Sequence, residues 1–576
     1  MSASADAVLA ACDLTKTFHA GGRDVTALEI VNFEARGGVV TGLVGPDGAG
    51  KTTLMRLAAG LLEPSSGQIR VLGYDATRES AKVQLAIGYM PQRFGLYEDL
   101  SVQENLDLYA DLQGVAPADR AERYQELLDM TGLAPFTHRL AGRLSGGMKQ
   151  KLGLACTLVR APRLLLLDEP TVGVDPVSRR ELWAIVYRLV AKETMSVLLS
   201  TAYLDEAERC AHLVLLHEGR VIGQGSPADF SQPMRGRTFH VRAPQTGRRR
   251  LQARLALLPG VLDATLEGEA VRLVTEEADM SLSLPGVAPE EITAVAPKFE
   301  DSFIARLRRE QPAPVPPPQA ERPPSTSDET VIVVNNLSRR FGDFLAVKNL
   351  SFSVGTGEIF GLLGANGAGK TTTFRMLCGL LPASGGQLQV AGVDLRTAPA
   401  AARARIGYMS QKFSQYGNLT VRQNLEFFAR AYGLSGNKRR LRLSWALQEM
   451  GLAEIATAES AELPLGFKQR LALCCALMHE PDILFLDEPT SGVDPLARRQ
   501  FWSRINALAE TGVTVLITTH FMEEAEYCDR LAIMASGEIL ALGTPREVKA
   551  RAGGAQGPAA SLEEAFLLLV QGKEAA

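Results

Sequence analysis

The 576-residue sequence lacks any apolar run of the roughly 18 to 20 residues that a membrane-spanning helix requires. Its first residues, MSASADAVLAACDL, also lack the basic flank and the apolar stretch of a secretory signal peptide. The sequence also lacks an excess of charge of one sign, because its 61 Lys and Arg nearly balance its 65 Asp and Glu and give a formal net charge of -4. Nucleic acid is therefore not expected as a partner. We expect the chain itself to be cytoplasmic.

Cysteine is also scarce, and its placement excludes two kinds of site. No C-x-x-C pair or metal-ligand spacing occurs, which favours reduced thiols in buried positions over disulfides or a metal centre. The seven cysteines are Cys12, Cys156, Cys210, Cys378, Cys474, Cys475 and Cys528. A chain of this length exceeds the size at which single cores stop growing, so several domains are expected.

The sequence contains one long internal repeat. GPDGAGKTT, from Gly45 to Thr53, returns as GANGAGKTT from Gly364 to Thr372. The offset of 319 residues (370 − 51 = 319) also relates the motif LLLLDEPTVGVDP to LFLDEPTSGVDP. Such register predicts two homologous domains, which we place at residues 1–230 and 330–548 and call the first half and the second half.

Residues between and after the two halves are not explained by the repeat. Residues 231–310 contain the strand-like runs TFHVRA and AVRLVT and the helix-like run RRRLQARLALL, and predict a small α+β appendage. Its basic clusters at Arg248–Arg250 and Arg306–Arg309 are interpreted as solvated helix surface. Residues 311–329 are rich in proline and predict an extended linker with a reach on the order of 60 Å, at about 3.1 Å per residue. Residues 549–576 predict a helical tail, and its run LEEAFL echoes FEDSFI in the appendage, so each half is expected to end in a similar helix.

Each glycine-rich repeat stands between a buried-strand pattern and a helical pattern. This context makes G-x-x-x-x-G-K-[ST] a phosphate-binding loop, because glycines let backbone N–H groups surround phosphate oxygens at a helix N-terminus. The lysine would meet the outer phosphates of ATP, and the threonine after it would ligate Mg²⁺. The candidate ATP-binding residues of the two loops are Gly45, Pro46, Asp47, Gly48, Ala49, Gly50, Lys51, Thr52 and Thr53, and Gly364, Ala365, Asn366, Gly367, Ala368, Gly369, Lys370, Thr371 and Thr372.

An acidic pair follows a short apolar run in each half. The pairs are Asp168–Glu169 and Asp487–Glu488. An unbroken apolar run is typical of a parallel strand covered on both faces, and acids at its carboxyl end lie where α/β sheets bind ligands. We expect each aspartate to hold Mg²⁺ through water and each glutamate to polarise the attacking water.

LSGGMKQ, from Leu144 to Gln150, together with DEPTVGVDP, resembles the signature of ABC-type ATPases. The resemblance implies an α/β fold class: two P-loop NTPase domains, each a RecA-like core with an antiparallel β-subdomain and a helical subdomain. It also implies that such domains pair head to tail and enclose each ATP between one P-loop and the other domain's signature. The signature residues Ser145, Gly146 and Gly147 are then ATP-binding.

The same resemblance assigns further roles. Gln92 and Gln411 match the glutamine that senses Mg²⁺ and the transmembrane subunit, and Phe18 and Phe341 match the aromatic that stacks on adenine. Asp175 and Asp494 match the loop that communicates across the dimer. The implied Mg²⁺ set is Thr52, Gln92, Asp168, Thr371, Gln411 and Asp487, and the implied catalytic residues are Glu169, Glu488 and His520.

Two departures from the pattern are informative. Ala202 stands where the second half has His520, and a methyl group cannot form the hydrogen bond by which the family's switch histidine holds the γ-phosphate. Pro464 and Leu465 stand where the first half has Ser145 and Gly146, so the second half lacks its signature. Head-to-tail pairing within one chain would collect both defects in one weak site, which also holds Asp47, and leave one strong site. Turnover is then expected mainly at the second P-loop.

The resemblance is strongest to drug-export ATPases whose membrane-spanning subunits are separate chains. It implies ATP hydrolysis coupled to export, permease subunits docking near residues 93–110 and 412–429, and a peripheral position on the inner face of the membrane, with a periplasmic adaptor as a possible further partner. A soluble tandem ATPase acting on ribosomes is the alternative, disfavoured by the Pro-rich linker and the net charge. A fused sugar-importer ATPase is a third interpretation, weakened because both P-loop lysines are present.

Overall fold

The computed structural model describes residues 7–20, 23–92, 95–242, 247–278, 287–310, 329–554 and 557–574. Contacts divide the chain into two compact units, each of which holds one half of the repeat. The first unit comprises Met1–Arg235, Ala296–Arg306 and Asp494–Leu496, and the second comprises Gly236–Val295, Leu307–Val493 and Ala497–Ala576. The predicted Pro-rich linker lies, at residues 311–328, outside the described residues.

The first unit is built on a six-stranded sheet in the order β10-β9-β3-β8-β7-β6. Five of its strands are parallel, and β10 pairs antiparallel with β9 at the edge. A separate antiparallel sheet has the order β2-β1-β4-β5. The strands are β1 (Ala7–Ala20), β2 (Arg23–Arg36), β3 (Val40–Val44), β4 (Ser66–Val71), β5 (Tyr74–Asp75), β6 (Ile87–Met90), β7 (Leu164–Asp168), β8 (Ser196–Thr201), β9 (His212–His217) and β10 (Arg220–Gly225).

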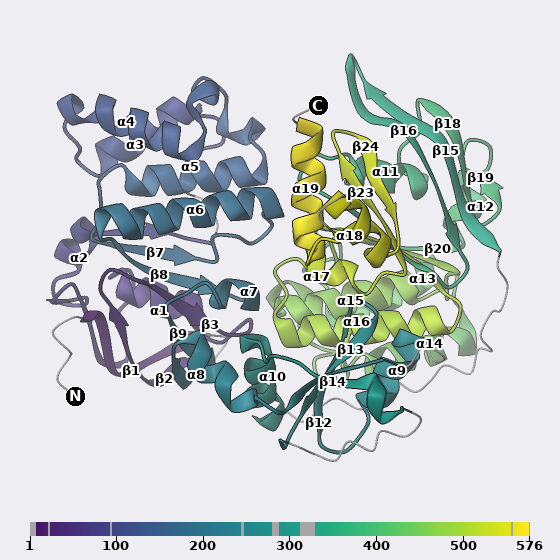
Figure 1. Ribbon diagram of the computed structural model, residues 1–576, viewed down its shortest axis with the longest axis horizontal. Coiled ribbons are helices and arrows are strands. Elements are labelled where there is room, and N and C mark those ends of the chain that lie inside the picture. Colours follow the sequence, from purple (N-terminus) through teal and green to yellow (C-terminus); the bar gives the residue numbers. More distant parts are fainter. Residues whose placement is uncertain are drawn as a thin grey trace. The chain divides into compact units, whose positions relative to one another are not determined.

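All residues of β3, β7 and β8 are buried, as expected for apolar strands covered on both faces. The helices are α1 (Lys51–Ala58), α2 (Ser80–Ala86), α3 (Val102–Leu112), α4 (Pro117–Thr131), α5 (Gly146–Leu158), α6 (Pro176–Glu193), α7 (Leu204–Ala207), α8 (Pro227–Ser231) and α10 (Phe299–Glu310). Figure 1 shows α3, α4 and α5 gathered beyond α6, on the side of β7 away from β1 and β2. The first half therefore has a sheet core, an antiparallel lobe and a helical lobe.

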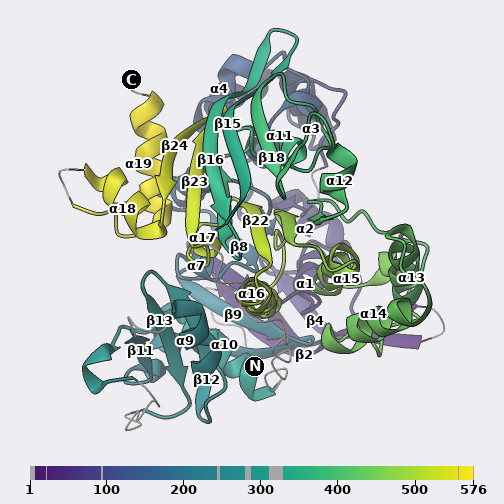
Figure 2. The ribbon, with the colours of Figure 1, turned by 90° about the vertical axis from the view of Figure 1, so that its right-hand side faces the viewer.

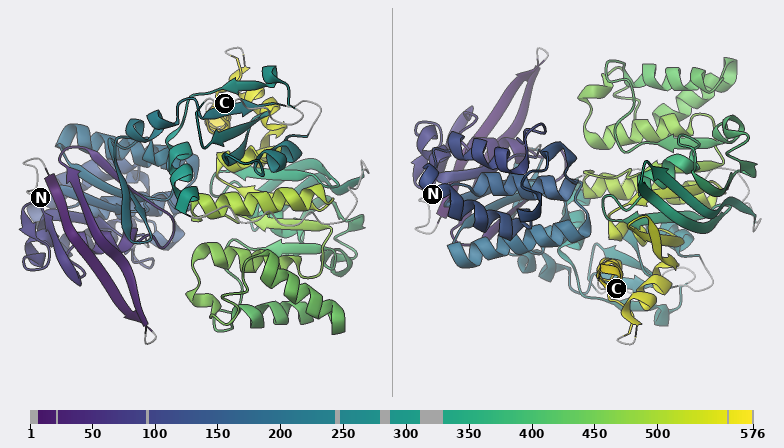
Figure 3. Two further views of the ribbon diagram at one scale, coloured as in Figure 1. Left: turned by 90° about the horizontal axis from the view of Figure 1, so that it is seen from below. Right: turned by 90° about the horizontal axis from the view of Figure 1, so that it is seen from above.

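The second half repeats this architecture, with sheets β20-β21-β22-β17-β23-β24 and β16-β15-β18-β19. Its strands are β15 (Thr330–Phe341), β16 (Phe344–Gly355), β17 (Ile359–Gly364), β18 (Gly385–Val390), β19 (Val393–Asp394), β20 (Ile406–Met409), β21 (Ile483–Asp487), β22 (Thr514–Thr519), β23 (Arg530–Ala535) and β24 (Glu538–Gly543). Its helices are α11 (Lys370–Leu377), α12 (Pro399–Arg403), α13 (Val421–Ala431), α14 (Gly436–Glu449), α15 (Leu465–Leu477), α16 (Pro495–Glu510), α17 (Met522–Ala525), α18 (Pro545–Gly553) and α19 (Leu562–Glu574). Both views in Figure 3 show the green helices of residues near 420–450 as a lobe set off from the sheet of this half.

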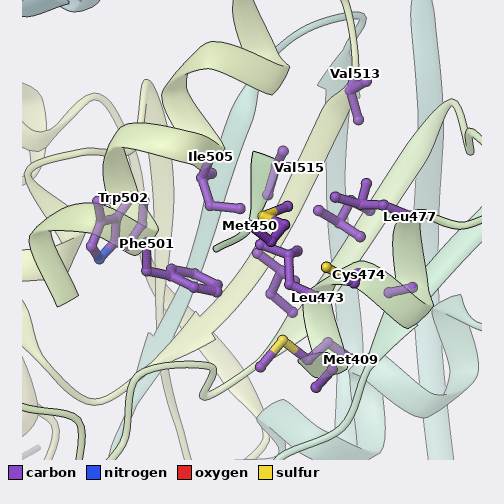
Figure 4. Close-up of a cluster of buried hydrophobic side chains, with 14 of the residues drawn as sticks. Met409, Met450, Leu473, Cys474, Leu477, Phe501, Trp502, Ile505, Val513 and Val515 are labelled. Carbon is purple, nitrogen blue, oxygen red and sulfur yellow. The ribbon is translucent and has the colours of Figure 1, made fainter. Parts of the chain in front are cut away.

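Packing between the helical lobe and the sheet core of the second half depends on one buried cluster. Figure 4 shows Phe501 and Ile505 of α16 directed toward Leu473 of α15, with Met409 of β20 beside them. Trp502 and Cys474 are buried in the same cluster. All seven cysteines are free, and six of them are buried, which agrees with the predicted core role.

The appendage forms the predicted strands and helix. Its four-stranded sheet has the order β12-β13-β11-β14, and one helix packs on it (Figure 2). The elements are β11 (Thr238–Val241), α9 (Arg248–Leu255), β12 (Val261–Glu267), β13 (Ala270–Thr275) and β14 (Ile292–Ala294). Contacts group Gly236–Val295 with the second half, whereas the start of α10 belongs with the first half. The segment that the sequence treats as one appendage is thus divided between the two units.

Helix α10 closes the first half as α19 closes the second, as the echo of sequence predicts. The backbone N–H of Phe299 donates to Glu208 Oε1 at 2.9 Å, and the Phe299 ring lies 5.6 Å from that of Phe230. In α19, Phe566 is fully buried. Among the described residues, we find no helix with the length and hydrophobicity needed to span a bilayer.

The prediction that Arg248–Arg250 are solvated surface is wrong for two of the three. Arg249 is 8% exposed and forms an ion pair with Asp529, and Arg248 donates to the backbone carbonyl of Glu526 at 2.7 Å. Only Arg250 keeps a mostly exposed side chain. The sequence pattern of a basic helix could not show that acidic groups and free carbonyls of a distant segment lie against it.

Candidate nucleotide-binding sites

The glycine-rich loops begin at the carboxyl ends of β3 and β17 and end at α1 and α11. Gly48 and Gly50 have φ values of 79° and 101°, and Gly367 and Gly369 have 84° and 99°. These left-handed conformations suit glycine and strain other residues. A Cβ on Gly45 would lie 2.2 Å from the backbone oxygen of Leu216, so this position also requires glycine.

The loop lysines are folded into their own loops. Lys51 Nζ donates to the backbone oxygens of Gly45 at 2.8 Å and Pro46 at 3.1 Å. Lys370 Nζ donates to the equivalent oxygens of Gly364 and Ala365 at 2.7 and 3.0 Å. Both lysines are almost fully buried, since each is only 5% exposed. A buried cation inside a glycine-rich loop at a helix N-terminus fits the outer phosphates of a nucleoside triphosphate.

The aspartate of each acidic pair is held by hydroxyl groups. Ser200 Oγ donates to Asp168 Oδ1 at 2.7 Å, and Thr52 Oγ1 donates to the same oxygen at 3.2 Å. In the second half Thr518 donates to Asp487. Burial raises the pKa of Asp487, the hydrogen bond from Thr518 opposes this, and the charge of Glu488 adds to it.

The donor set of each half fits Mg²⁺ held together with phosphate and water. Mg²⁺ usually takes one or two carboxylates and fills its other positions with waters and substrate phosphates. Asp168 and Thr52 supply one carboxylate and one hydroxyl, and Asp487 and Thr371 are their equivalents. In the described part of the chain, no cluster of three or more His, Cys, Asp or Glu side chains could hold a metal ion by itself.

The two candidate catalytic glutamates share an uncommon backbone conformation. Glu169 has φ 50° and Glu488 has φ 46°, in the left-handed region that costs energy for a residue with a side chain. Their N–H groups donate to the backbone oxygens of Ser200 at 3.1 Å and Thr518 at 3.0 Å, which hold the chain in this turn. Such strain is typical of functional positions, where it aims a side chain.

Each glutamate also receives a hydrogen bond from the predicted glutamine of its half. Gln92 Nε2 donates to Glu169 Oε2 at 2.6 Å, and Gln411 Nε2 donates to Glu488 Oε2 at 2.8 Å. The structure therefore brings together, in each half, the loop lysine, the acidic pair and the glutamine that the sequence singles out.

The surroundings of the two glutamates differ at one position. His520 Nδ1 lies 3.2 Å from Glu488 Oε2, and both side chains are buried. Although burial pushes the pKa of Glu488 upward, His520, Lys370 and Gln411 together hold it below its ordinary value. In the first half, Ala202 is buried at the histidine's position, and Glu169 Oε1 lies 3.2 Å from Lys51 Nζ.

The signature segment lies at the start of α5 in the first half and of α15 in the second. Ser145 Oγ caps α5 by accepting a hydrogen bond from the N–H of Met148 at 3.3 Å. Pro464 occupies the same position before α15 and provides no side-chain cap. The second half therefore lacks both the hydroxyl and the glycine that begin this segment in the first half.

Comparison with known proteins adds the family to this geometry. The sequence profile described as "ABC transporter" matches residues 28–172 and 347–491, one match in each half. The chain belongs to the ABC transporter family. Its two family domains are arranged in tandem and have the P-loop NTPase fold, and the family binds ATP, typically with Mg²⁺.

Three relatives illustrate the extent of the likeness to other ABC proteins. This chain is 51% identical to "Probable multidrug ABC transporter ATP-binding protein YbhF" of Escherichia coli (strain K12) over 572 residues, which cover 98% of each chain. It is 38% identical to "Linearmycin resistance ATP-binding protein LnrL" of Bacillus subtilis (strain 168) over 42% of this chain and 79% of that one. It is 46% identical to "Nod factor export ATP-binding protein I" of Burkholderia orbicola (strain AU 1054) over 36% and 69%.

The aromatic residues predicted to stack on adenine lie near the ends of their strands in both ABC halves. Phe18 of β1 is 37% exposed, and Lys16 Nζ lies 5.1 Å from its ring centre. Phe341 ends β15, is 46% exposed, and lies 4.6 Å from the guanidinium of Arg339. Both rings are accessible to a planar ligand.

Ser200 and Thr518 are further residues of these candidate sites that sequence reasoning missed. Each hydroxyl donates to the candidate Mg²⁺-ligating aspartate of its half and accepts from the N–H of the adjacent glutamate, Glu169 at 2.9 Å and Glu488 at 3.0 Å. Their signal is weak, because a hydroxyl residue inside a buried strand has no motif of its own. The two residues could have been found from their place in the repeat, because Ser200 lies two residues before Ala202 and Thr518 lies two residues before His520.

Proposed function

We propose that this chain is the ATP-hydrolysing motor of a membrane exporter for drug-like compounds. Relatives named for multidrug transport, linearmycin resistance and Nod factor export support export as the process. The observation that carries the proposal is the set of buried polar groups around Glu488, where His520, Gln411 and the loop lysine converge on one carboxylate.

The two halves are proposed to pair head to tail within one chain. The strong composite site then combines Lys370, Glu488 and His520 with the signature Leu144–Gln150 of the first half. Its support is the complementary placement of the two departures, since the half with the histidine lacks the signature serine and the half with the serine lacks the histidine. If like halves of two chains paired instead, every site would carry one defect.

Glu488 is proposed to be the general base of the strong site. Bound ATP with Mg²⁺ supplies the phosphoanhydride bond whose hydrolysis drives the motor. Like any glutamate with a pKa at or below its ordinary value, Glu488 is charged at neutral pH, and it is proposed to accept a proton from the attacking water. Gln411 and His520 fix its position, and Lys370 offsets negative charge that develops during phosphoryl transfer.

The weak site is proposed to bind ATP with little turnover. It would combine Lys51 and Ala202 with Pro464 and Leu465 of the second half. Glu169 lies 3.2 Å from the loop lysine and has no histidine beside it, because Ala202 occupies that position. Asp47, where the second half has Asn366, adds a carboxylate to the phosphate loop and disfavours a polyanion there.

The membrane partners are proposed to be permease subunits on separate chains. They would dock near residues 93–110 and 412–429, of which 93 and 94 lie outside the described residues. The remaining parts contain the starts of α3 and α13, each fixed by a capping box, Ser101 with Glu104 and Thr420 with Gln423. The chain would then be cytoplasmic and peripheral on the inner face of the membrane, with a periplasmic adaptor as a further component.

Affinity capture of the tagged full chain from detergent-solubilised membranes tests the exporter proposal. We expect permease subunits to co-purify, and we expect the same from the Glu488→Gln variant, because docking does not depend on the catalytic base. Capture of ribosomal proteins in place of membrane proteins would overturn the exporter and support the soluble tandem factor.

A further inference from the structure

The part of the appendage that belongs to the second unit, Gly236–Val295, enters by strand β11 and leaves by the neighbouring strand β14. The chain leaves the first unit after Arg235 and returns to it at Ala296. Thr238 Oγ1 donates to the backbone oxygen of Val295 at 2.7 Å, and the N–H of Val295 donates to the backbone oxygen of Thr238 at 3.0 Å. The entry and exit points are therefore bonded to each other, and the appendage is attached to the first half at both ends.

The body of the appendage packs on the second half, beginning with helix α9. Arg248 donates to the backbone oxygen of Glu526 at 2.7 Å and also to that of Cys528. The buried Arg249 forms an ion pair with the partly exposed Asp529, and Arg250 Nε lies 2.6 Å from Glu510 Oε2. Three consecutive arginines thus contact the same half.

A second group of polar contacts comes from strand β12, the turn after it, and Gln252 of α9. Asp263 of β12 forms an ion pair with Arg499 of α16, and both side chains are nearly buried. Asn506 Nδ2 donates to Gln252 Oε1 at 2.9 Å, and the N–H of Gly268 donates to Glu526 Oε2 at 3.1 Å. Breaking a buried ion pair by removing one partner is strongly destabilising, because the other charge stays buried.

Apolar side chains make this contact continuous with the core of the second half. Leu251 and Leu255 of α9 and Leu273 of β13 belong to the same buried cluster as Trp502 and Ile505 of α16. A shared core of this kind is typical of a permanent interface rather than of a transient one. The appendage and the second half therefore behave as one folded body.

The surface of the second half that contacts the appendage has polar residues that the first half lacks. The repeat offset of 319 residues, which drops to 318 near Thr201 and Thr519, aligns Asp529, Glu510 and Asn506 with Ala211, Ala191 and Tyr187 of the first half. Two of the three polar partners are thus replaced by alanine, which cannot pair with Arg249 or Arg250. The first half does not offer an equivalent binding surface, although its fold is the same.

We propose that the appendage is a non-covalent strap that holds the two ABC halves of one chain together without nucleotide and independently of the Pro-rich linker. It is covalently continuous with the first half at both ends and is bound to the second half through ion pairs, one of them buried, and a common core. Because of the strap, each half experiences a high effective concentration of the other half at every stage of an ATP cycle. It favours pairing within the chain over pairing between chains.

Cleavage of the linker tests the strap. A protease site is placed within residues 311–328 of the full chain, the purified protein is cut, and the fragments are separated by size-exclusion chromatography with EDTA and without nucleotide. We expect the two wild-type fragments to elute as one particle. The double variant Asp529→Ala, Glu510→Ala places in the second half the alanines that the first half has at the matching positions. We expect the Kd between the two fragments of this variant to be at least tenfold higher than for the wild type.

Two further variants and one matched control separate loss of the strap from loss of folding. Asp263→Ala changes the appendage alone and leaves both ABC halves unaltered, and we expect it to weaken fragment association as well. Arg499→Ala should do the same, whereas Arg180→Ala at the matching position of the first half should not. Uncut variants are checked for a cooperative thermal unfolding transition, which shows that each variant still folds. Separation of the wild-type fragments after cutting, or variant fragments that associate as tightly as the wild type, would overturn the proposal.

Discussion

Glu488 Oε2 lies 3.2 Å from His520 Nδ1 in the second half, whereas in the first half Glu169 Oε1 lies 3.2 Å from Lys51 Nζ, and Ala202 replaces the histidine. The two glutamates have the same left-handed backbone and the same bond from a glutamine. The two carboxylates thus share the loop lysine and the glutamine as neighbours and differ in the added histidine. This difference, together with the departures at Pro464 and Leu465, is the basis for assigning turnover to the second P-loop.

Removing His520 should change the pH dependence of ATP hydrolysis. Burial raises the pKa of Glu488, and His520 is foremost among the groups that lower it, so that the net shift is downward. His520→Ala therefore raises this pKa, and the base becomes protonated at a higher pH. We expect the acid limb of the ATPase–pH profile to move to higher pH and the maximal rate to fall by about 10² to 10³, as for the loss of one positioned hydrogen-bonding group.

The control for this measurement is Ala202→His in the first half. Because the segment assigned to face it carries Pro464 and Leu465, the added histidine should change the ATPase rate by no more than about twofold. An acid limb that stays in place in His520→Ala would show that the contact with Glu488 does not tune the base.

Repairing the weak site should create a second site of turnover. The triple change Ala202→His, Pro464→Ser and Leu465→Gly restores the switch histidine, the signature hydroxyl and the signature glycine. In a Glu488→Gln background, we expect ATPase activity to rise by about tenfold or more, within the range that general-base catalysis supplies. The rise should disappear when Glu169→Gln is added. Recovery that does not depend on Glu169 would contradict the assignment of this site.

Gly147 and Gly466 occupy matching positions but should respond differently to alanine. A Cβ on Gly147 would lie 2.3 Å from Ser178 Oγ and 2.5 Å from Ser178 Cβ, whereas a Cβ on Gly466 would lie 3.3 Å from Ala497 Cβ. Gly147→Ala should therefore destabilise the first half by about 1 to 3 kcal/mol, as overpacking does, and move the start of α5. Gly466→Ala should cost much less. Thermal unfolding of both variants checks this, and equal shifts would contradict the close approach of Ser178 to Gly147.

The local parts of the sites could be predicted from sequence because each depends on a short stretch of chain. Each phosphate-binding loop, with Lys51 or Lys370, lies between a strand and a helix that are its neighbours in sequence. Each acidic pair stands at the end of a buried strand, so its position is also fixed locally. Ser200 and Thr518 could not be found in this way, because they approach the aspartates only through strand pairing. The burial of Arg249 was not predictable either, since its partner Asp529 is distant in the chain.

The central claim is that hydrolysis occurs mainly at the second P-loop, and the ATPase rates of Glu488→Gln and Glu169→Gln test it most directly. Each change removes the proton-accepting oxygen and preserves shape, so the two variants are matched. We expect Glu488→Gln to lower the rate by about 10² to 10⁴, the contribution of a general base, and Glu169→Gln to retain most of it. An equal loss in both variants would contradict the account.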